Sequence, residues 1–338
     1  NTGQYNTIMG AETAVSMQGG SYNSIIGRRS GYGLTSGAYN TALGGYALYS
    51  NQTGTGNVAM GSHAGYSFVG SGGVFLGYEA GRGVSSADVV LIGYKAGKRA
   101  LGTGNVGIGY TALYGADSTA ANNTGTYNTA IGQYALNWFS KTIGSTAVGA
   151  EAGYYTTGSY NTFMGYKAGH GGTTSAPYSS GTHNVALGYN ALAAFTTGND
   201  NVAIGSAAGD AITSGYRNVT IGRYAGSAIN TGVSNIILGY AAGDAITDTG
   251  YTVLIGEQAG GAINSTDSNY TIAIGYNALQ NLTNGVNNIG IGGLTQTGIT
   301  TGNNNITFGY GAMADFNAGV NSANSSGNIA IGTSAMGG

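Results

Sequence analysis

The residues of this chain that could do acid–base or nucleophilic chemistry are few and scattered. Its three histidines, His63, His170 and His183, have no serine or carboxylate at a shared spacing that would pair a base with a nucleophile. Gly-x-Gly strings such as residues 102–104 imitate phosphate-binding loops, but no helical pattern follows them. Twelve acidic residues are too few for a calcium-binding nonapeptide repeat. We therefore expect no enzyme activity, no cofactor and no metal site.

The candidates for a binding role lie where the chain departs from an internal repeat. Residues 113–126, 169–183 and 313–326 each carry six additional residues, and residues 137–141 contain the single Trp. Long loops on a rigid scaffold commonly carry binding residues, although tolerated decoration is the simpler interpretation. The candidate surface-contact residues are Trp138, Phe139, Lys141, Pro177, Tyr178 and Phe316.

The composition excludes several classes of protein. About one residue in five is Gly (66 of 338), whereas charged residues make up 7% and Pro occurs once. The glycines do not recur at every third position, which excludes collagen. A net charge of −2 with 41% hydrophobic residues is unlike a disordered chain. Ten dispersed basic residues make no nucleic-acid footprint, the absence of Cys excludes disulfides, and no apolar run is long enough to span a membrane.

One short motif recurs along the whole chain. Its commonest form is Asn-x-Ala-Ile-Gly, and 19 copies follow one another, mostly 16 or 17 residues apart. The residue one before the closing glycine is always large and apolar, and the residue three before it is Thr, Val or Ile in 18 copies. Such side chains two residues apart indicate a β-strand. The closing glycines are Gly10, Gly27, Gly44, Gly61, Gly77, Gly93, Gly109, Gly132, Gly149, Gly165, Gly188, Gly205, Gly222, Gly239, Gly256, Gly275, Gly292, Gly309 and Gly332.

A period of 17 residues is too short for helical repeats and matches one coil of a parallel β-solenoid. We expect a flattened coil of two short strands and two turns. Asn stands four before the closing glycine in 14 copies, which favours a left-handed corner or a stacked Asn ladder. Ala stands three after it in 16 copies, where a bend would admit only a small side chain.

The predicted fold is therefore all-β, a parallel β-solenoid of about 19 coils in one continuous array over residues 1–338. The sequence begins with neither Met nor a signal-peptide pattern. We expect it to be a window of a longer fibrous protein.

Both faces of the predicted strand are apolar. The residue two before the closing glycine is Ala in eight copies and charged in none. A strand that is apolar on both faces is buried on both, so one face would fill the coil and the other would need a second chain. The abundant Ala and Gly would let backbones approach a common axis, which favours a homotrimer.

Two further patterns predict contacts between coils. Glu79 and Lys95 occupy the same register in consecutive coils, as do Glu151 and Lys167, and such neighbours would form ladder ion pairs. Tyr directly follows the closing glycine in eight copies. We expect these rings to stack on neighbouring coils or across the trimer, with glycan binding as the alternative. They are Tyr78, Tyr94, Tyr110, Tyr166, Tyr189, Tyr240, Tyr276 and Tyr310.

The pattern Asn-x-Ala-Ile-Gly-x-x-Ala in a Gly-rich, Cys-free chain resembles the head repeats of trimeric autotransporter adhesins of the Yersinia adhesin type. The resemblance covers all 19 copies, including residues 128–132 and 201–205, although that family's repeat is a few residues shorter. Those heads are left-handed parallel β-rolls that assemble as trimers, so the resemblance implies a trimer. The longer form, as at residues 39–44, also resembles tail-fibre-like repeat proteins.

The function that we predict is structural and adhesive. The chain would form a homotrimeric rod at the cell surface or outside the cell, as part of a bacterial surface adhesin or filament. Its partners would be its sister chains, a host-surface glycan or protein receptor, and further copies stacked end to end, since neither terminal coil carries a polar cap. A phage tail-fibre shaft or receptor-binding protein, located on the virion, is the alternative.

A remote alternative is a solenoid that binds ice or another crystal surface. This function would need an outward column of Thr in every coil. Thr7, Thr41 and Thr129 give way to Val58 and Ile236 at the same register. The sequence therefore predicts that this column faces inward, which argues against ice binding.

Overall fold

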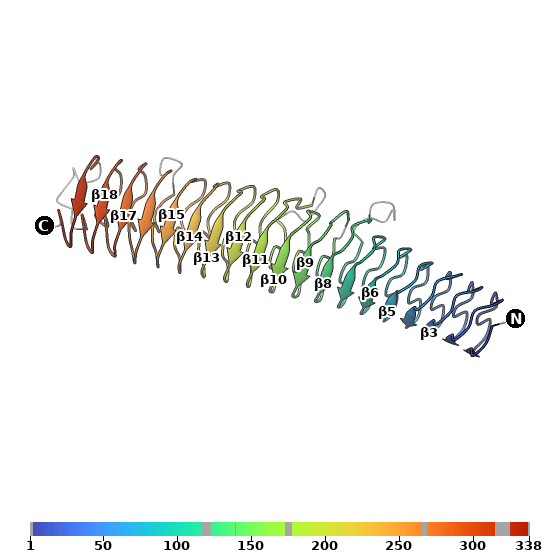
Figure 1. Ribbon diagram of the computed structural model, residues 1–338. Helices are drawn as coiled ribbons and strands as arrows, with labels where there is room; N and C mark the ends of the chain where they lie inside the picture. Colours follow the sequence, from blue (N-terminus) through green and yellow to red (C-terminus); the bar gives the residue numbers. More distant parts are fainter. Residues whose placement is uncertain are drawn as a thin grey trace. The chain divides into compact units, whose positions relative to one another are not determined.

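The computed structural model describes residues 3–115, 123–138, 140–172, 178–264, 269–314 and 325–336. Within these ranges it contains 19 strands and no helix. The chain divides into two compact units, residues 1–164 and 165–338. Each unit is a parallel β-solenoid in which the strands lie side by side along one face (Figure 1). The predicted all-β solenoid is confirmed.

Every strand has three residues and belongs to one coil. In the second unit, Val202 of β12 pairs with Val219 of β13, and the register continues without a shift through the rest of both strands. The first unit contains β1 (Thr7–Met9), β2 (Ser24–Ile26), β3 (Thr41–Leu43), β4 (Val58–Met60), β5 (Val74–Leu76), β6 (Val90–Ile92), β7 (Val106–Ile108), β8 (Thr129–Ile131), β9 (Thr146–Val148) and β10 (Thr162–Met164). The second contains β11 (Val185–Leu187), β12 (Val202–Ile204), β13 (Val219–Ile221), β14 (Ile236–Leu238), β15 (Val253–Ile255), β16 (Ile272–Ile274), β17 (Ile289–Ile291), β18 (Ile306–Phe308) and β19 (Ile329–Ile331).

Each coil has one strand, so the expectation of two strands per coil is wrong. The rest of the coil consists of tight turns with left-handed backbone at three registers. In the coil of Gly188 these are His183, Asn190 and Leu192, with φ of 58°, 53° and 51°. A non-glycine residue rarely adopts such angles. The segment between the third bend and the next coil, residues 193–199, forms turns and bends and no second strand.

Hydrogen bonds between coils continue through the turns. The backbone N–H of Tyr224 donates to the carbonyl oxygen of Ser206 (3.0 Å), and that of Gly226 donates to Ala242 (2.9 Å). These bonds satisfy backbone groups that would otherwise be left unpaired beyond the short strand. Each coil is therefore held by its neighbours around much of its circumference.

The closing glycine has a geometric reason to recur without exception. Gly222 has a φ of 130°, a conformation that side chains disfavour. A Cβ atom there would lie 2.4 Å from the carbonyl oxygen of Gly239, the closing glycine of the next coil. Both the backbone conformation and the neighbouring coil thus exclude a side chain.

The interior of each coil is narrow. In the coil of Gly222, the buried side chains are Asn218, Thr220, Ala225 and Ile229, all without solvent exposure. Thr220 stands two before the closing glycine, so this register faces inward. The predicted inward position of the register three before the glycine is wrong. Sequence could not distinguish them because both faces of the strand are apolar. The small residues at the register two before the glycine, such as Ala203, consequently pack inside the chain's own coil.

The asparagines four before the closing glycine form a buried ladder, one of the two arrangements that the sequence predicts. Asn218 Nδ2 donates to Oδ1 of Asn201 (3.1 Å) and to the carbonyl oxygen of Gly232 across the coil (2.8 Å). Its own Oδ1 accepts from the backbone N–H and Nδ2 of Asn235. The left-handed residue is the one before the asparagine, here Arg217 with φ 56°. The alternative of a left-handed asparagine is therefore wrong.

Candidate interaction surfaces

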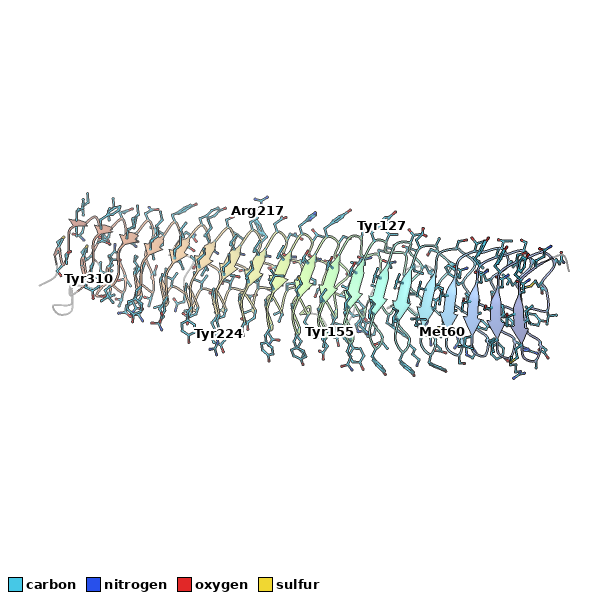
Figure 2. The ribbon with its side chains drawn as sticks, turned by 60° about the horizontal axis from the view of Figure 1, so that its bottom comes forward. Met60, Tyr127, Tyr155, Arg217, Tyr224 and Tyr310 are labelled. Carbon is cyan, nitrogen blue, oxygen red and sulfur yellow. The ribbon has the colours of Figure 1, made fainter. Side chains whose placement is uncertain are left out.

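The most extensive candidate surface is the outward side of the strands. We call it the outer face, and it consists of the residues one and three before each closing glycine. In the 19 described strands, every such residue is Val, Ile, Leu, Met, Phe, Thr or Ser. Many are well exposed, including Leu43 (41%), Met60 (42%, labelled in Figure 2) and Ile236 (43%). Each unit therefore presents two parallel columns of largely apolar side chains without a charge.

The size of the outer face exceeds what scattered surface residues give. With strands about 4.8 Å apart, ten strands extend a column to roughly 45 Å in the first unit. Soluble monomers rarely expose a contiguous apolar patch of more than a few hundred Å². Such a face fits an apolar partner better than solvent.

The predicted stacking of tyrosines that follow the closing glycine is confirmed for consecutive members. In the first unit, the ring centroids of Tyr78 and Tyr94 lie 5.4 Å apart, and those of Tyr94 and Tyr110 lie 5.1 Å apart. In the second unit, Tyr166 and Tyr189 stack at 5.7 Å. These rings retain a large exposed fraction, 39% for Tyr94. They line one edge of the outer face.

A second tyrosine column lies five residues before the closing glycine and was not predicted. Tyr5, Tyr22 and Tyr39 stack at 4.9 and 5.0 Å, and Tyr22, the middle ring, is 51% exposed. Tyr127 holds the same register and projects from the upper edge of the first unit in Figure 2. The recurring Tyr-Asn dipeptide was the available signal. The outer face is thus bordered by aromatic rings on both sides.

Charged side chains gather in the first unit, in a group that we call the basic cluster: Glu79, Arg82, Lys98 and Arg99. Glu79 is only 4% exposed, and its Oε2 lies 2.6 Å from Lys98 Nζ while its Oε1 accepts from Arg82. The predicted ladder pair with Lys95 is wrong, because Arg82 and Lys98 occupy the carboxylate. Lys95 Nζ lies instead 4.8 Å from the Tyr94 ring centroid.

A ladder pair of the expected kind does form elsewhere. Glu12 and Arg29 hold the same register in consecutive coils and make a salt bridge. Glu151 and Lys167, the other predicted pair, belong to different units. Charges of the same register therefore pair at Glu12 and Arg29, whereas Glu79 pairs with Arg82 and Lys98.

The electrostatics of the basic cluster follow from these contacts. Burial acts to raise the pKa of Glu79, but the hydrogen bonds from Lys98 and Arg82 outweigh it, so the pKa is lowered. The pKa of nearby His63 is lowered by burial and by the positive charge of Arg82. Glu79 is therefore ionised and paired at neutral pH, and His63 is uncharged.

The predicted surface-contact residues do not form one site. Trp138 is half-buried with its ring 6.2 Å from that of Tyr155, and Lys141 is exposed; both lie in the first unit. Tyr178 is half-buried in the second unit, and burial raises its pKa. Phe139, Pro177 and Phe316 lie outside the described residues.

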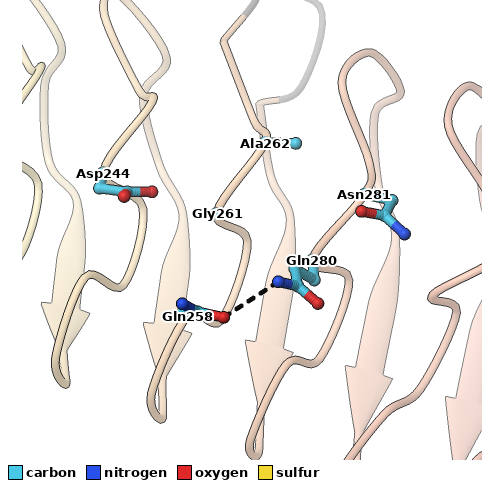
Figure 3. Close-up of a pocket in the computed structure, with 6 residues that line it drawn as sticks. All are labelled: Asp244, Gln258, Gly261, Ala262, Gln280 and Asn281. Carbon is cyan, nitrogen blue, oxygen red and sulfur yellow. Dashed lines mark hydrogen bonds between the residues drawn. The ribbon is translucent and has the colours of Figure 1, made fainter.

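A polar pocket of about 230 Å³ opens in the second unit. Gln280 donates through Nε2 to Oε1 of Gln258 at 3.0 Å. Asp244 and Asn281 lie on either side of this pair (Figure 3). Burial raises the pKa of Asp244. The two Gln side chains hydrogen-bond to each other, and the cavity volume is below the ~300 Å³ of small-molecule sites. We therefore do not propose a ligand for this pocket.

In the described parts of the chain, no group of three His, Asp or Glu side chains is placed to hold a metal ion. The same parts contain no helix that is long and apolar enough to cross a membrane. No protein-family model matches the sequence, and no curated protein matches it either.

Proposed function

We propose that this chain is a structural segment of an extracellular fibre, in which the outer faces of three copies pack against one another. The observation that carries the proposal is the outer face itself: two uncharged, largely apolar columns on the strand side of each unit, with half-exposed Leu, Ile and Met side chains. Burial of apolar surface contributes about 25 cal/mol per Å², so a stripe of this length is a substantial driving force for association.

The regularity of the outer face favours a second copy of this chain as the partner. The outward residues recur once per coil and in register, as Val202 with Val219 and Ile204 with Ile221 show. A sister chain aligned in parallel carries the same columns with the same repeat. Its side chains can then pack in the same way along the whole face, which an unrelated globular surface would not achieve.

The three-fold order and the adhesive role are supported by the resemblance to trimeric adhesin heads. A rod of this kind at the surface of a bacterium would project or form a binding appendage. A phage tail-fibre shaft remains the alternative, because it would use the same face. The tyrosine columns that border the outer face supply exposed rings for contacts with a receptor.

Ice binding finds less support, although the register three before the closing glycine does face outward. Thr41, Thr129 and Thr146 occupy it in the first unit. In the second unit it holds only Val or Ile, as at Val202 and Ile236. A surface that matches a crystal lattice through hydroxyl groups would need them at regular intervals in both units.

Sedimentation velocity and native mass spectrometry test the proposal. We expect a species of three chains at micromolar concentration. A monodisperse monomer over a wide concentration range would contradict association through the outer face. A stable dimer or tetramer would contradict the three-fold order.

A further inference from the structure

One pocket of the first unit combines cations with hydroxyl groups and is not part of the outer face. Tyr66, Ser67, Arg82, Gly83, Lys98 and Arg99 line a cavity of about 420 Å³, which lies within the range of small-molecule sites. These residues stand five and six after their closing glycines, beyond the bend that follows the strand. Assembly through the outer face would therefore leave the pocket open.

The pocket carries an excess of positive charge in a chain that is acidic overall. Residues 28–99 contain six of the ten basic residues and only two of the twelve acidic ones. Glu79 forms salt bridges with both Arg82 and Lys98, so its carboxylate offsets one of the three positive charges that line the pocket. Arg99 forms none of the salt bridges found among the described residues. The guanidinium of Arg99 is thus available for an anionic ligand.

The cations are held in place before any ligand binds. Lys98 is only 16% exposed at its side chain and is fixed by Glu79. The Arg82 guanidinium carbon lies 5.7 Å from the ring centroid of Tyr66. Tyr66 in turn stacks on Tyr49 at 4.9 Å with nearly parallel planes. Pre-ordered donors lose less entropy on binding than mobile surface side chains do.

The spacing of the donors suits a polymer. Ser67, Gly83 and Arg99 hold one register in three consecutive coils, and Tyr66, Arg82 and Lys98 hold the adjacent one. Successive coils are about 4.8 Å apart, which is close to the advance of one sugar unit along an extended polysaccharide. Gly83 contributes no side chain, so the pocket continues as an open groove from Ser67 to Arg99.

We propose that this groove binds an extended acidic polysaccharide, whose carboxylate or sulfate groups contact Arg82, Lys98 and Arg99 while its hydroxyl groups contact Tyr66 and Ser67. This inference depends on the first unit alone and does not require the trimer. It extends the proposed adhesive role by naming the site and the chemistry of the ligand.

Isothermal titration calorimetry of the full chain at low salt tests this proposal. The probes are hexagalacturonate, a sulfated heparin hexasaccharide, fully methyl-esterified hexagalacturonate, hexaglutamate and sodium sulfate. We expect at least one of the two acidic hexasaccharides to bind. Arg99→Gln should weaken that binding by roughly tenfold, the effect of losing one charge-assisted hydrogen bond. Arg217→Gln, which changes an exposed Arg beside Tyr216 in the second unit, should leave it unchanged.

The remaining outcomes decide against the proposal. Binding of neither hexasaccharide overturns it, and so does equal binding by the Arg99→Gln variant when its melting temperature is unchanged. Equal affinity for the methyl ester would show that charge is not recognised. Equal affinity for hexaglutamate or for sulfate alone would show that a sugar chain is not the ligand. Because the oligomeric state is measured separately, failure here leaves the fibre proposal untouched.

Discussion

Leu279 occupies the space that Gly290 leaves empty. A Cβ atom on Gly290 would lie 2.0 Å from Cδ1 of Leu279, which belongs to the preceding coil. At Phe75 the large residue and the glycine stand at the opposite registers. A Cβ atom on Gly81, which holds the register of Leu279, would lie 2.2 Å from the Phe75 ring. The narrow interior is thus filled from two registers, two before and four after the closing glycine. A large residue at one of them packs against a glycine at the other.

Replacing Leu279 and Gly290 by alanine, singly and together, should show that their effects on stability are coupled. We expect Gly290→Ala to destabilise the second unit by about 1–3 kcal/mol through overpacking, and Leu279→Ala by about 2–5 kcal/mol through a cavity. In the double variant the new methyl group enters the space that Leu279 vacates, so its loss should be smaller than the sum by about 1 kcal/mol. Urea denaturation measures all three. Gly293→Ala, where a Cβ atom meets only ordinary contacts, is the control and should be nearly neutral. Strict additivity would show that the two residues do not share space.

The asparagine ladder should tolerate a shorter hydrogen-bonding side chain at Asn218 better than the loss of all its side-chain hydrogen bonds. Asn218→Ala deprives the backbone N–H and Nδ2 of Asn235 of their acceptor and the carbonyl of Gly232 of its donor. We expect a loss of about 3 kcal/mol in free energy of unfolding, because these groups are buried. Asn218→Thr should lose roughly half as much, since Thr252 continues the ladder naturally with Oγ1 donating to Asn235 at 2.8 Å. Equal loss from Asn199→Ala, an exposed asparagine, would contradict a special role for the ladder.

Adjacent residues of β12 should separate folding from assembly. Ala203 is fully buried, whereas Ile204 belongs to the outer face and is half-exposed. Ala203→Asp places a charge in the interior, and we expect circular dichroism to show loss of cooperative folding. Ile204→Asp should keep the β spectrum and sediment as a monomer. If Ile204→Asp leaves the oligomer intact, the outer face is not the interface.

The pH dependence of stability should show the burial of Asp210. Burial raises its pKa, and no described residue gives its Oδ1 a hydrogen bond. The stability linked to a raised carboxyl pKa is present below the unfolded value and is lost as the pH rises through the folded value. Because Asp210 is only half-buried and solvent screens its charge, Asp210→Asn should raise the melting temperature by about 1 °C or less at pH 7 and give no gain near pH 3. Asp200→Asn, at an exposed site, should change neither value. A gain that is independent of pH would contradict this origin.

The period and the recurring chemistry of single positions made the fold predictable. A closing Gly in 19 copies, a β-branched residue three before it and Asn four before it define a coil, a strand and a ladder. The left-handed bends were not predictable, because residues as different as Glu79, Lys95 and Leu48 occupy them. Their backbone is imposed by contacts with the neighbouring coils and not by local preference.

The candidate surfaces were predictable only in part. The sequence showed two apolar strand faces, but Ala203 and Ile204 are both apolar, so hydrophobicity could not tell which one faces outward. The pairing of Glu79 with Lys98 joins residues in different registers of neighbouring coils. Such a contact depends on how the turn aims each side chain, which the one-dimensional pattern of charges does not contain.

The left-handed bends in each coil also bear on how the chain comes to be folded. An isolated coil would carry this backbone strain without the hydrogen bonds that neighbouring coils supply, so a few coils must form together before the structure can hold. Thereafter each new coil is templated by the one before it, about 17 residues earlier. A chain that is synthesised from the N-terminus onward is thus suited to fold in the same direction, coil after coil. Each completed coil would then serve as the nucleus for the next one, so the costly first step occurs only once along the chain.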